Sequence, residues 1–181
     1  MIRYVAFLRG INLGKRRVEM ARLRTLFEEM GFVDVATFIA SGNVLFSAAE
    51  RDASKLESRI AGGLQRAQGY DVDTFVRPLS AVAAIASSHP FPDGAESDTV
   101  HVAFLHDALD ARTARSLAAL RTTEDRFVVH GTEYYWSCSV RTSDSKVWTL
   151  RELKALALPS ATMRNMTSVR KLVAKHQSDA E

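Results

Sequence analysis

The sequence predicts an α+β protein made of two related β-α-β-β-α-β halves, and three observations support this. Apolar runs of strand-forming residues alternate with stretches of helical periodicity. The tetrapeptide "VAFL" occurs at residues 5–8 and again at 102–105. A polar, aperiodic segment, residues 87–99, separates the two similar orders of elements. We therefore expect one half over residues 1–88 and a second over 89–181, each an antiparallel sheet with its helices on one face.

The first half opens with a strand and an amphipathic helix. Residues 4–9, "YVAFLR", are a strand that stops at Gly10. Apolar residues then recur at spacings of three and four, which predicts a helix that ends near Gly31. These apolar residues are Met20, Leu23, Phe27 and Met30.

A hairpin and a second helix follow. "VATFIAS" and "NVLFS" are predicted strands, joined by a turn at Ser41-Gly42-Asn43 because Gly and Asn tolerate positive φ. The Ser54 to Glu57 spacing is that of a capping box and predicts a helix start. Gly62-Gly63 is expected to bend or end that helix. "YDVDTFVRP" is the fourth strand, after which Ser80 is expected to cap a short helix.

The second half is expected to repeat this order and then to diverge at its C-terminal end. We place Phe127 and Gly131 opposite Phe38 and Gly42, with a shorter helix, "ARTARSLAALR", before them. "EYYWSCSV" alternates polar and apolar residues as a half-buried strand does. "KVWTLRELKAL" is a helix, and "TMRNMTSVRKLVAKHQ" is predicted to be helical rather than an eighth strand.

Composition indicates an ordinary globular protein, with 46% hydrophobic and 25% charged residues. There is no apolar run long enough for a membrane span, and the N-terminus does not resemble a signal peptide. The single cysteine, Cys138, fits a reducing compartment, and on an apolar strand face we expect an inert buried thiol. The histidines lack metal-binding motifs. We therefore expect a cytoplasmic protein with no membrane partner, metal or cofactor.

The positive charge is concentrated at two places in the chain. Residues 3–24 carry seven Arg and Lys against one acid, and residues 160–176 carry four with no acid. The loop at 9–17, "RGINLGKRR", joins two glycines to three consecutive cations, which suits a phosphate or carboxylate. It is not a Walker A loop, because three residues separate its glycines and Arg16 follows Lys15. The alternative is a structural loop whose cations are simply solvated.

Several pieces together resemble one family. They are "YVAFLRGINLG", "FIASGNVLFS", "HPFP", Ser145-Lys146 and "TMRNMTSVRKL", and they are similar to the bacterial DUF1697 proteins. The resemblance implies two ferredoxin-like halves and an activity that is not established. The family's terminal pattern is similar to T-A-R-N-W-N-T-V-x-K-L, from which this chain departs at Met166, Thr167 and Ser168. A role of the family's Trp therefore does not carry over.

Our preferred functional hypothesis is a noncatalytic module that binds an anionic small molecule or a nucleic acid. The candidate binding residues are Arg9, Asn12, Lys15, Arg16, Ser41, Asn43, Arg164 and Asn165. For the last two, capping and bracing of the final helix is the alternative. A small cofactor-independent enzyme acting on an anionic metabolite and a protein-interaction module are the rival functions. The sequence marks no catalytic residue and predicts no oligomeric state.

Overall fold

The chain divides into two compact units, and a computed structural model describes residues 1–12, 14, 17–39 and 42–176 of it. The first unit runs from Met1 to Ile85 and takes in the chain from Leu172 onward, and the second is Ala86–Lys171. Each unit is built around one four-stranded antiparallel sheet. None of the helices in the described part of the chain has the length and apolar character needed to cross a membrane.

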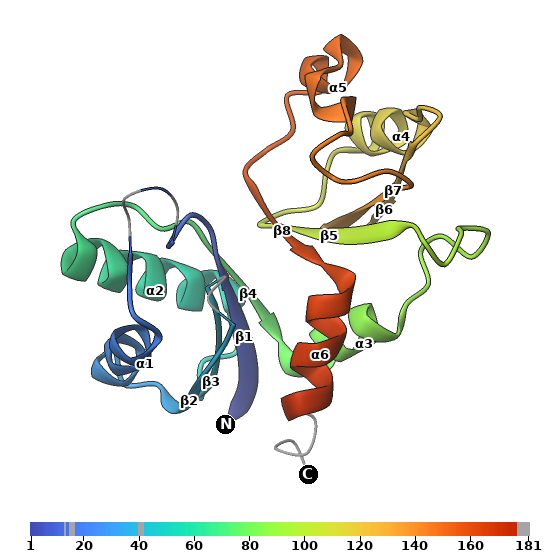
Figure 1. The fold of residues 1–181 in the computed structure, drawn as a ribbon. Helices are drawn as coiled ribbons and strands as arrows, with labels where there is room; N and C mark the ends of the chain where they lie inside the picture. Colours follow the sequence, from blue (N-terminus) through green and yellow to red (C-terminus); the bar gives the residue numbers. More distant parts are fainter. Residues whose placement is uncertain (13, 15–16, 40–41, 177–181) are drawn as a thin grey trace. The chain divides into compact units, whose positions relative to one another are not determined.

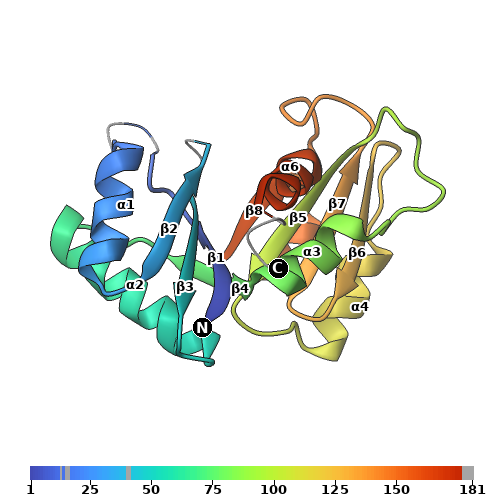
Figure 2. The same cartoon turned by 90° about the horizontal axis from the view of Figure 1, so that it is seen from below.

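The first unit has the predicted β-α-β-β-α-β order. Its elements are β1 (Ile2–Leu8), α1 (Met20–Glu29), β2 (Val33–Phe38), β3 (Asn43–Ala48), α2 (Ala53–Gln68) and β4 (Thr74–Pro78). The strands lie in the order β2-β3-β1-β4, and every neighbouring pair is antiparallel (Figure 1). Both helices cover the same face of this sheet (Figure 2).

Strand alternation builds the core of the first unit. Tyr4, Ala6 and Leu8 of β1 point to the helical face, where they join the apolar stripes of α1 and α2. Val5 and Phe7, which alternate with these residues and point to the opposite face, are also completely buried. The strands β1 and β3 are thus buried on both faces, which explains their nearly continuous apolar sequences, whereas β2 has exposed residues such as Val33.

The helices of this unit confirm some sequence predictions and correct two others. Gly31 ends the α1 turn with φ +79°. The N-cap of α2 is Asp52, which accepts a hydrogen bond from the Ser54 amide, so the predicted capping box is wrong. The helix also continues through Gly63, where a Cβ would lie 2.2 Å from the Met30 sulfur. The absence of a side chain there lets α1 and α2 approach closely, and this contact stabilises the continuous helix.

The second unit repeats the sheet. After α3 (Leu79–Ser87) come β5 (Thr99–Leu105), α4 (Ala111–Ala119), β6 (Asp125–His130), β7 (Glu133–Cys138), the 3₁₀ turn η1 (Val147–Thr149), α5 (Arg151–Ala155), β8 (Ala161–Asn165) and α6 (Met166–His176). The strand order β6-β7-β5-β8 is that of the first sheet. Residues of α4, η1 and α5 pack on one face of it (Figure 1).

The prediction that the C-terminal segment is helical from its start is wrong. Ala161–Asn165 form β8, which pairs antiparallel with β5. Five residues are too few for periodicity to separate a strand from a helix end, and the open edge of β5 supplies the partner that decides. The Asn165 side chain then accepts a hydrogen bond from the Thr167 amide at 2.8 Å, which starts α6.

The two sheets confirm the duplication but correct our alignment of the hairpins. Phe7 pairs with Asn43 in the first sheet, and Phe104 pairs with Glu133 in the second. Because four residues (39–42) join β2 to β3 and only two (131–132) join β6 to β7, the counterpart of Phe38 is His130 rather than Phe127.

The strand β7 is buried on both faces, whereas its alternation predicted one polar face. All six of its residues are buried. Tyr134 and Trp136 pack into the core of their own unit, beside Cys138. The polar residues on the other side, such as Ser137 with 2% exposure, are covered as well.

Each sheet is followed by a helix that the predicted repeat does not include. In α3, Leu79, Val82 and Ile85 are buried at the spacing that a helix face requires. The corresponding positions of α6 are also buried, and they are Met166, Val169 and Leu172. The duplicated element is therefore one helix longer than the sequence suggested.

Candidate functional site

The loop of residues 9–19, which joins β1 to α1, is anchored to the first unit at several points. The Arg9 amide donates to the Asp73 carbonyl at 2.8 Å. The Tyr70 hydroxyl donates to the Ile11 carbonyl, and the Asn12 side-chain oxygen accepts from the Val18 amide at 2.7 Å. Hydrogen bonds to buried or distant backbone groups hold both ends of a loop in place. Loop 9–19 is thus fixed at its ends by the fold.

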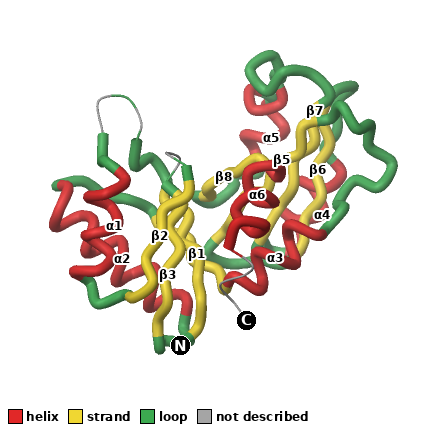
Figure 3. The backbone as a smooth tube through the Cα atoms, turned by 60° about the horizontal axis from the view of Figure 1, so that its bottom comes forward, coloured by secondary structure: helices red, strands yellow, loops and turns green. Residues whose placement is uncertain are grey.

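The turn of residues 39–42 packs against this loop. The Leu8 amide donates to the Gly42 carbonyl at 2.9 Å, directly before the loop begins. A Cβ on Gly42 would lie 2.6 Å from Cγ2 of Ile11, so the loop and the turn approach closely only because this residue is glycine. The described ends of turn 39–42 and loop 9–19 therefore meet at one edge of the first unit, where Gly42 lies against Ile11 (Figure 3).

Three of the eight predicted binding residues belong to this edge. Arg9 is exposed, Asn12 is half-buried, and Asn43 is 2% exposed with its side-chain amide donating to the Phe38 carbonyl. Asn12 and Asn43 therefore shape the loop and the turn, and their role in binding stays a prediction. Three further predicted residues, Lys15, Arg16 and Ser41, lie outside the described residues.

The remaining two predicted residues, Arg164 and Asn165, belong to the second unit. Arg164 donates to the Thr162 hydroxyl and to the Met163 carbonyl, and burial lowers its pKa to about 10. Asn165 caps α6. The Asn165 contact agrees with the alternative of capping the last helix, whereas both of these Arg164 contacts lie within β8. Since the units are described separately, the participation of these two residues in one site with Arg9 stays a prediction.

Arg77 occupies the same register position in the first sheet that Arg164 occupies in the second. Arg77 pairs with Val5, and Arg164 pairs with Val102, the counterpart of Val5. Each guanidinium donates to the carbonyl of its preceding residue at 2.9 Å. An arginine at this point of the last strand is therefore a property of the repeated fold.

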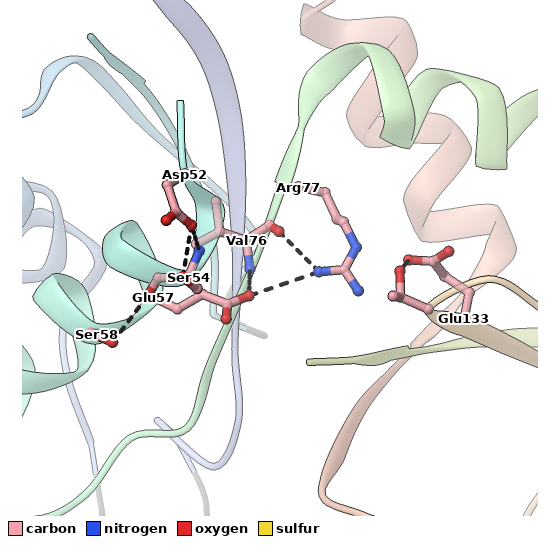
Figure 4. A network of polar contacts seen from close by, with 8 residues as sticks. Asp52, Ser54, Glu57, Ser58, Val76, Arg77 and Glu133 are labelled. Carbon is pink, nitrogen blue, oxygen red and sulfur yellow. Dashed lines mark hydrogen bonds and ion pairs between the residues drawn. The ribbon is translucent and has the colours of Figure 1, made fainter. Parts of the chain in front are cut away.

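Glu57 protects the outer edge of β4. Its carboxylate accepts from the Val76 amide at 2.8 Å and lies 3.8 Å from the Arg77 guanidinium (Figure 4). The capping-box interpretation assigned Glu57 to its own helix start, whereas the structure directs it to a strand edge. An unpaired edge amide is a template for aggregation, and a bound carboxylate blocks it.

The end of α6 contributes residues that sequence reasoning did not assign to a site. The Lys175 amine lies 5.9 Å from the centre of the Phe38 ring, and the His176 ring meets the same ring edge-on at 6.3 Å. Phe38 directly precedes turn 39–42. One cation of the basic C-terminal segment therefore lies beside the edge that loop 9–19 and turn 39–42 form.

The second unit contains a buried polar cluster around Asp125. Its carboxylate accepts hydrogen bonds from the Trp136 indole, the Ser145 hydroxyl and the Thr122 hydroxyl, each at 2.8 Å. Asp125 is 2% exposed, and Trp136 is equally buried. These hydrogen bonds connect β6 and β7 to Ser145, in the segment before η1, so the cluster has a structural role.

Burial of His101 predicts a loss of stability in acid. Its ring stacks on Trp136 with centroids 5.0 Å apart, and desolvation lowers its pKa from 6.5. Between the lowered pKa and 6.5 the unfolded chain binds a proton that the folded chain does not, so the free energy of unfolding falls as the pH drops below about 6.5. His101→Phe should reduce this fall, measured by urea unfolding at pH 7.0 and 5.5.

His89 offers a matched control for this prediction, because its side chain is exposed. His89→Phe should leave the difference in unfolding free energy between the two pH values as it is in the parent protein. An equal reduction in both variants would show that the burial of His101 is not the cause.

Cys138 is a buried free thiol in the structure. Burial raises the pKa of the Cys138 thiol, which donates to the Val140 carbonyl, so a thiolate is disfavoured. Within the described ranges, no group of three or more His, Cys, Asp and Glu side chains is placed to hold a metal ion.

Comparisons with known proteins agree with this fold. The structure of conserved bacterial protein SP0830 from Streptococcus pneumoniae matches with a TM-score of 0.76 and 22% sequence identity, over 98% of this chain and 99% of that one. A search of curated proteins found no match. The model of the DUF1697 family, a protein family of unknown function, matches residues 1–135. Since this match covers most of the sequence, the chain belongs to the DUF1697 family.

Proposed function

We propose that this protein binds a phosphate-bearing small molecule at the edge formed by loop 9–19 and turn 39–42, without catalysing a reaction. The observation that carries the proposal is the internal comparison of the two units. The connection from β1 to α1 has eleven residues (9–19), whereas the equivalent connection from β5 to α4 has five (106–110). A chain that closes the same fold with five residues does not need eleven for folding.

Turn 39–42 is lengthened in the same way, with four residues against two in its counterpart. Both extended connections belong to the first unit and pack against each other through Gly42 and Ile11. Loops that exceed what their connection requires commonly carry function. Their placement side by side supports a shared binding role.

Charge supports an anionic ligand. Loop 9–19 carries Arg9, Lys15, Arg16 and Arg17, and both Arg9 and Arg17 are exposed. The short counterpart at 106–110 contains Asp107 and Asp110 instead. Asp110 caps α4 through the amides of Arg112 and Thr113, so the second unit uses its acid for folding. The positive charge is thus particular to the extended loop.

The test is a charge-neutral loop. Replacing the four cations by Gln (R9Q, K15Q, R16Q and R17Q) should weaken the binding of pyrophosphate, followed by titration calorimetry, at least about tenfold, since charge-assisted hydrogen bonds are the strong ones. A matched control replaces four exposed arginines elsewhere, Arg51, Arg66, Arg112 and Arg115, by Gln. The control variant has the same net charge as the loop variant, and it should bind pyrophosphate as tightly as the parent protein does.

The salt dependence of binding separates this ligand class from a nucleic acid. A polynucleotide that contacts several phosphates should lose affinity steeply as salt rises, whereas one phosphate group gives a shallow slope. If the loop variant and its control lose the same affinity for pyrophosphate, the loss is due to net charge and not to the position of the cations in loop 9–19. No binding of pyrophosphate by the parent protein would refute the proposal.

A further inference from the structure

We propose that the outer edge of β8 binds a carboxylate attached to an apolar group, through the Met163 amide and the Arg164 guanidinium. This site lies in the second unit and is independent of the proposed phosphate site. The first unit contains the same arrangement with a carboxylate in place, because Glu57 occupies the corresponding edge of β4 (Figure 4). The repeat therefore indicates which ligand chemistry this edge accepts.

The edges of β4 and β8 correspond residue by residue. Val76 pairs with Ala6 in the first sheet, and Met163 pairs in the second sheet with Ala103, the counterpart of Ala6 in the repeated "VAFL". In each sheet the arginine that follows donates to the carbonyl of this residue at 2.9 Å. The same guanidinium thus lies at the same backbone position in both units.

The Met163 amide points away from its sheet. The Leu105 amide donates to the Thr132 carbonyl beside β7, and since hydrogen bonding alternates along an antiparallel strand, the backbone of Ala103 also faces β7. Ala103 and Met163 are therefore a pair without mutual hydrogen bonds, and the Met163 amide lies at the outer edge of β8. Among the described residues, this amide has no acceptor.

The first unit supplies the acceptor from α2, the helix that carries Glu57. The equivalent connection in the second unit contains η1 and α5, which have three and five residues against sixteen in α2. The described segment between β7 and β8 has two acids, Asp144 and Glu152, and both are exposed. Neither accepts a hydrogen bond from the Met163 amide. The second unit thus keeps the two donors and provides no carboxylate for the amide.

The side chains at the edge indicate the apolar part of the ligand. Val76 is 0% exposed and packs in one cluster with Leu56 and Ile60 of α2. Its counterpart Met163 is only half-buried, and so is Ala161, two residues before it on the same face. A ligand that reaches the Met163 amide from the side where α2 lies in the first unit would contact this apolar surface. Burial of that surface favours an apolar chain on the carboxylate.

The experiment follows the backbone amides of the full chain in proton–nitrogen NMR spectra while sodium hexanoate or sodium acetate is added. We expect the Met163 amide proton to shift to higher frequency and the shift to saturate, because a carboxylate deshields the proton that it accepts. The Val76 amide already donates to Glu57 and should not shift. Hexanoate should bind about fivefold more tightly than acetate, as for a few tens of Å² of apolar contact.

Two variants test the donors. Glu57→Ala removes the carboxylate of the first unit, so the Val76 amide should then shift with hexanoate, while Met163 responds as in the parent protein. Arg164→Gln should weaken hexanoate binding at Met163 about fivefold, since charge-assisted hydrogen bonds are the strong ones. Arg112→Gln is the matched control, because Arg112 is an exposed arginine of the same unit, and it should keep the parent affinity.

A Met163 amide that does not shift, or that shifts no more than the Val76 amide of the parent protein, would disprove the site. Equal affinity for acetate and hexanoate would overturn the apolar part of the proposal and leave the carboxylate site. A free acid and an acidic side chain on a partner's helix share this chemistry, so a peptide of residues 50–70, which contain α2, is titrated as well. Saturation of the Met163 shift at a lower concentration of peptide than of hexanoate assigns the carboxylate to a partner's helix, and the reverse order assigns it to a free acid.

Discussion

Gly42→Ala should destabilise the protein by about 2–4 kcal/mol, because it adds a steric clash to an unfavourable backbone conformation. The φ of +78° alone disfavours alanine. In addition, the new Cβ would lie 2.6 Å from Ile11 Cγ2 and 3.3 Å from the Leu8 carbonyl oxygen. That backbone atom belongs to β1 and has little room to move. Urea unfolding of the variant measures the effect.

Gly69→Ala provides the control for this prediction. Gly69 has a φ of +76° at the end of α2, and a Cβ there would meet nothing within 4 Å. It should cost only about 1 kcal/mol, the strain of the left-handed conformation alone. If the two variants are equally destabilised, the contact between turn 39–42 and loop 9–19 is not tight. If Gly42→Ala is the more unstable and also binds pyrophosphate poorly, the contact shapes the binding edge.

Asp125→Ala should destabilise the second unit by about 2–4 kcal/mol, because it removes an acceptor from one buried and two half-buried donors. These donors are the Trp136 indole and the hydroxyls of Ser145 and Thr122. The loss should also appear in Trp136, whose near-UV circular dichroism reports an indole fixed by its hydrogen bond. Urea unfolding and the near-UV spectrum are the measurements.

Asp125→Asn is the conservative variant for this prediction, and Asp144→Ala is its control. Asn keeps the shape and one acceptor oxygen, so the destabilisation should be smaller than for Ala. Asp144 is exposed, and its carboxylate accepts a hydrogen bond from its neighbour Ser143, so its removal should change stability by less than about 0.5 kcal/mol. An Asp125→Ala protein as stable as the parent would show that the cluster does not hold the 139–147 segment in place.

The duplicated fold explains how one unit can specialise without loss of architecture. Both sheets keep the same strand order and an arginine at the same register position, Arg77 and Arg164. The differences lie in the connections, where loop 9–19 exceeds its counterpart. Connections commonly tolerate insertions, although Ile11 and Val18 of loop 9–19 pack into the core of the first unit. The second unit thus serves as an internal reference for what the fold alone requires.

The sequence by itself determined the local elements and the composition of the candidate edge. The spacing of Leu23 and Phe27 predicted α1, whose buried residues they are. The repeated "VAFL" identified β1 and β5, and the basic run at residues 9–17 identified most of the loop that joins β1 to α1. These features depend on neighbours a few residues away, so that periodicity and turn chemistry are enough to predict them.

Only the tertiary structure decided which distant residues each of these segments contacts. Ala161–Asn165 form a strand because they pair with β5. The Glu57 side chain accepts a hydrogen bond from the Val76 amide instead of capping its own helix. Lys175 lies beside the Phe38 ring. Each of these depends on residues far apart in the chain, and short-range patterns contain no information about which distant group supplies a hydrogen bond or a contact. Local propensity therefore specified the elements, and long-range packing specified the edge where we place the ligand.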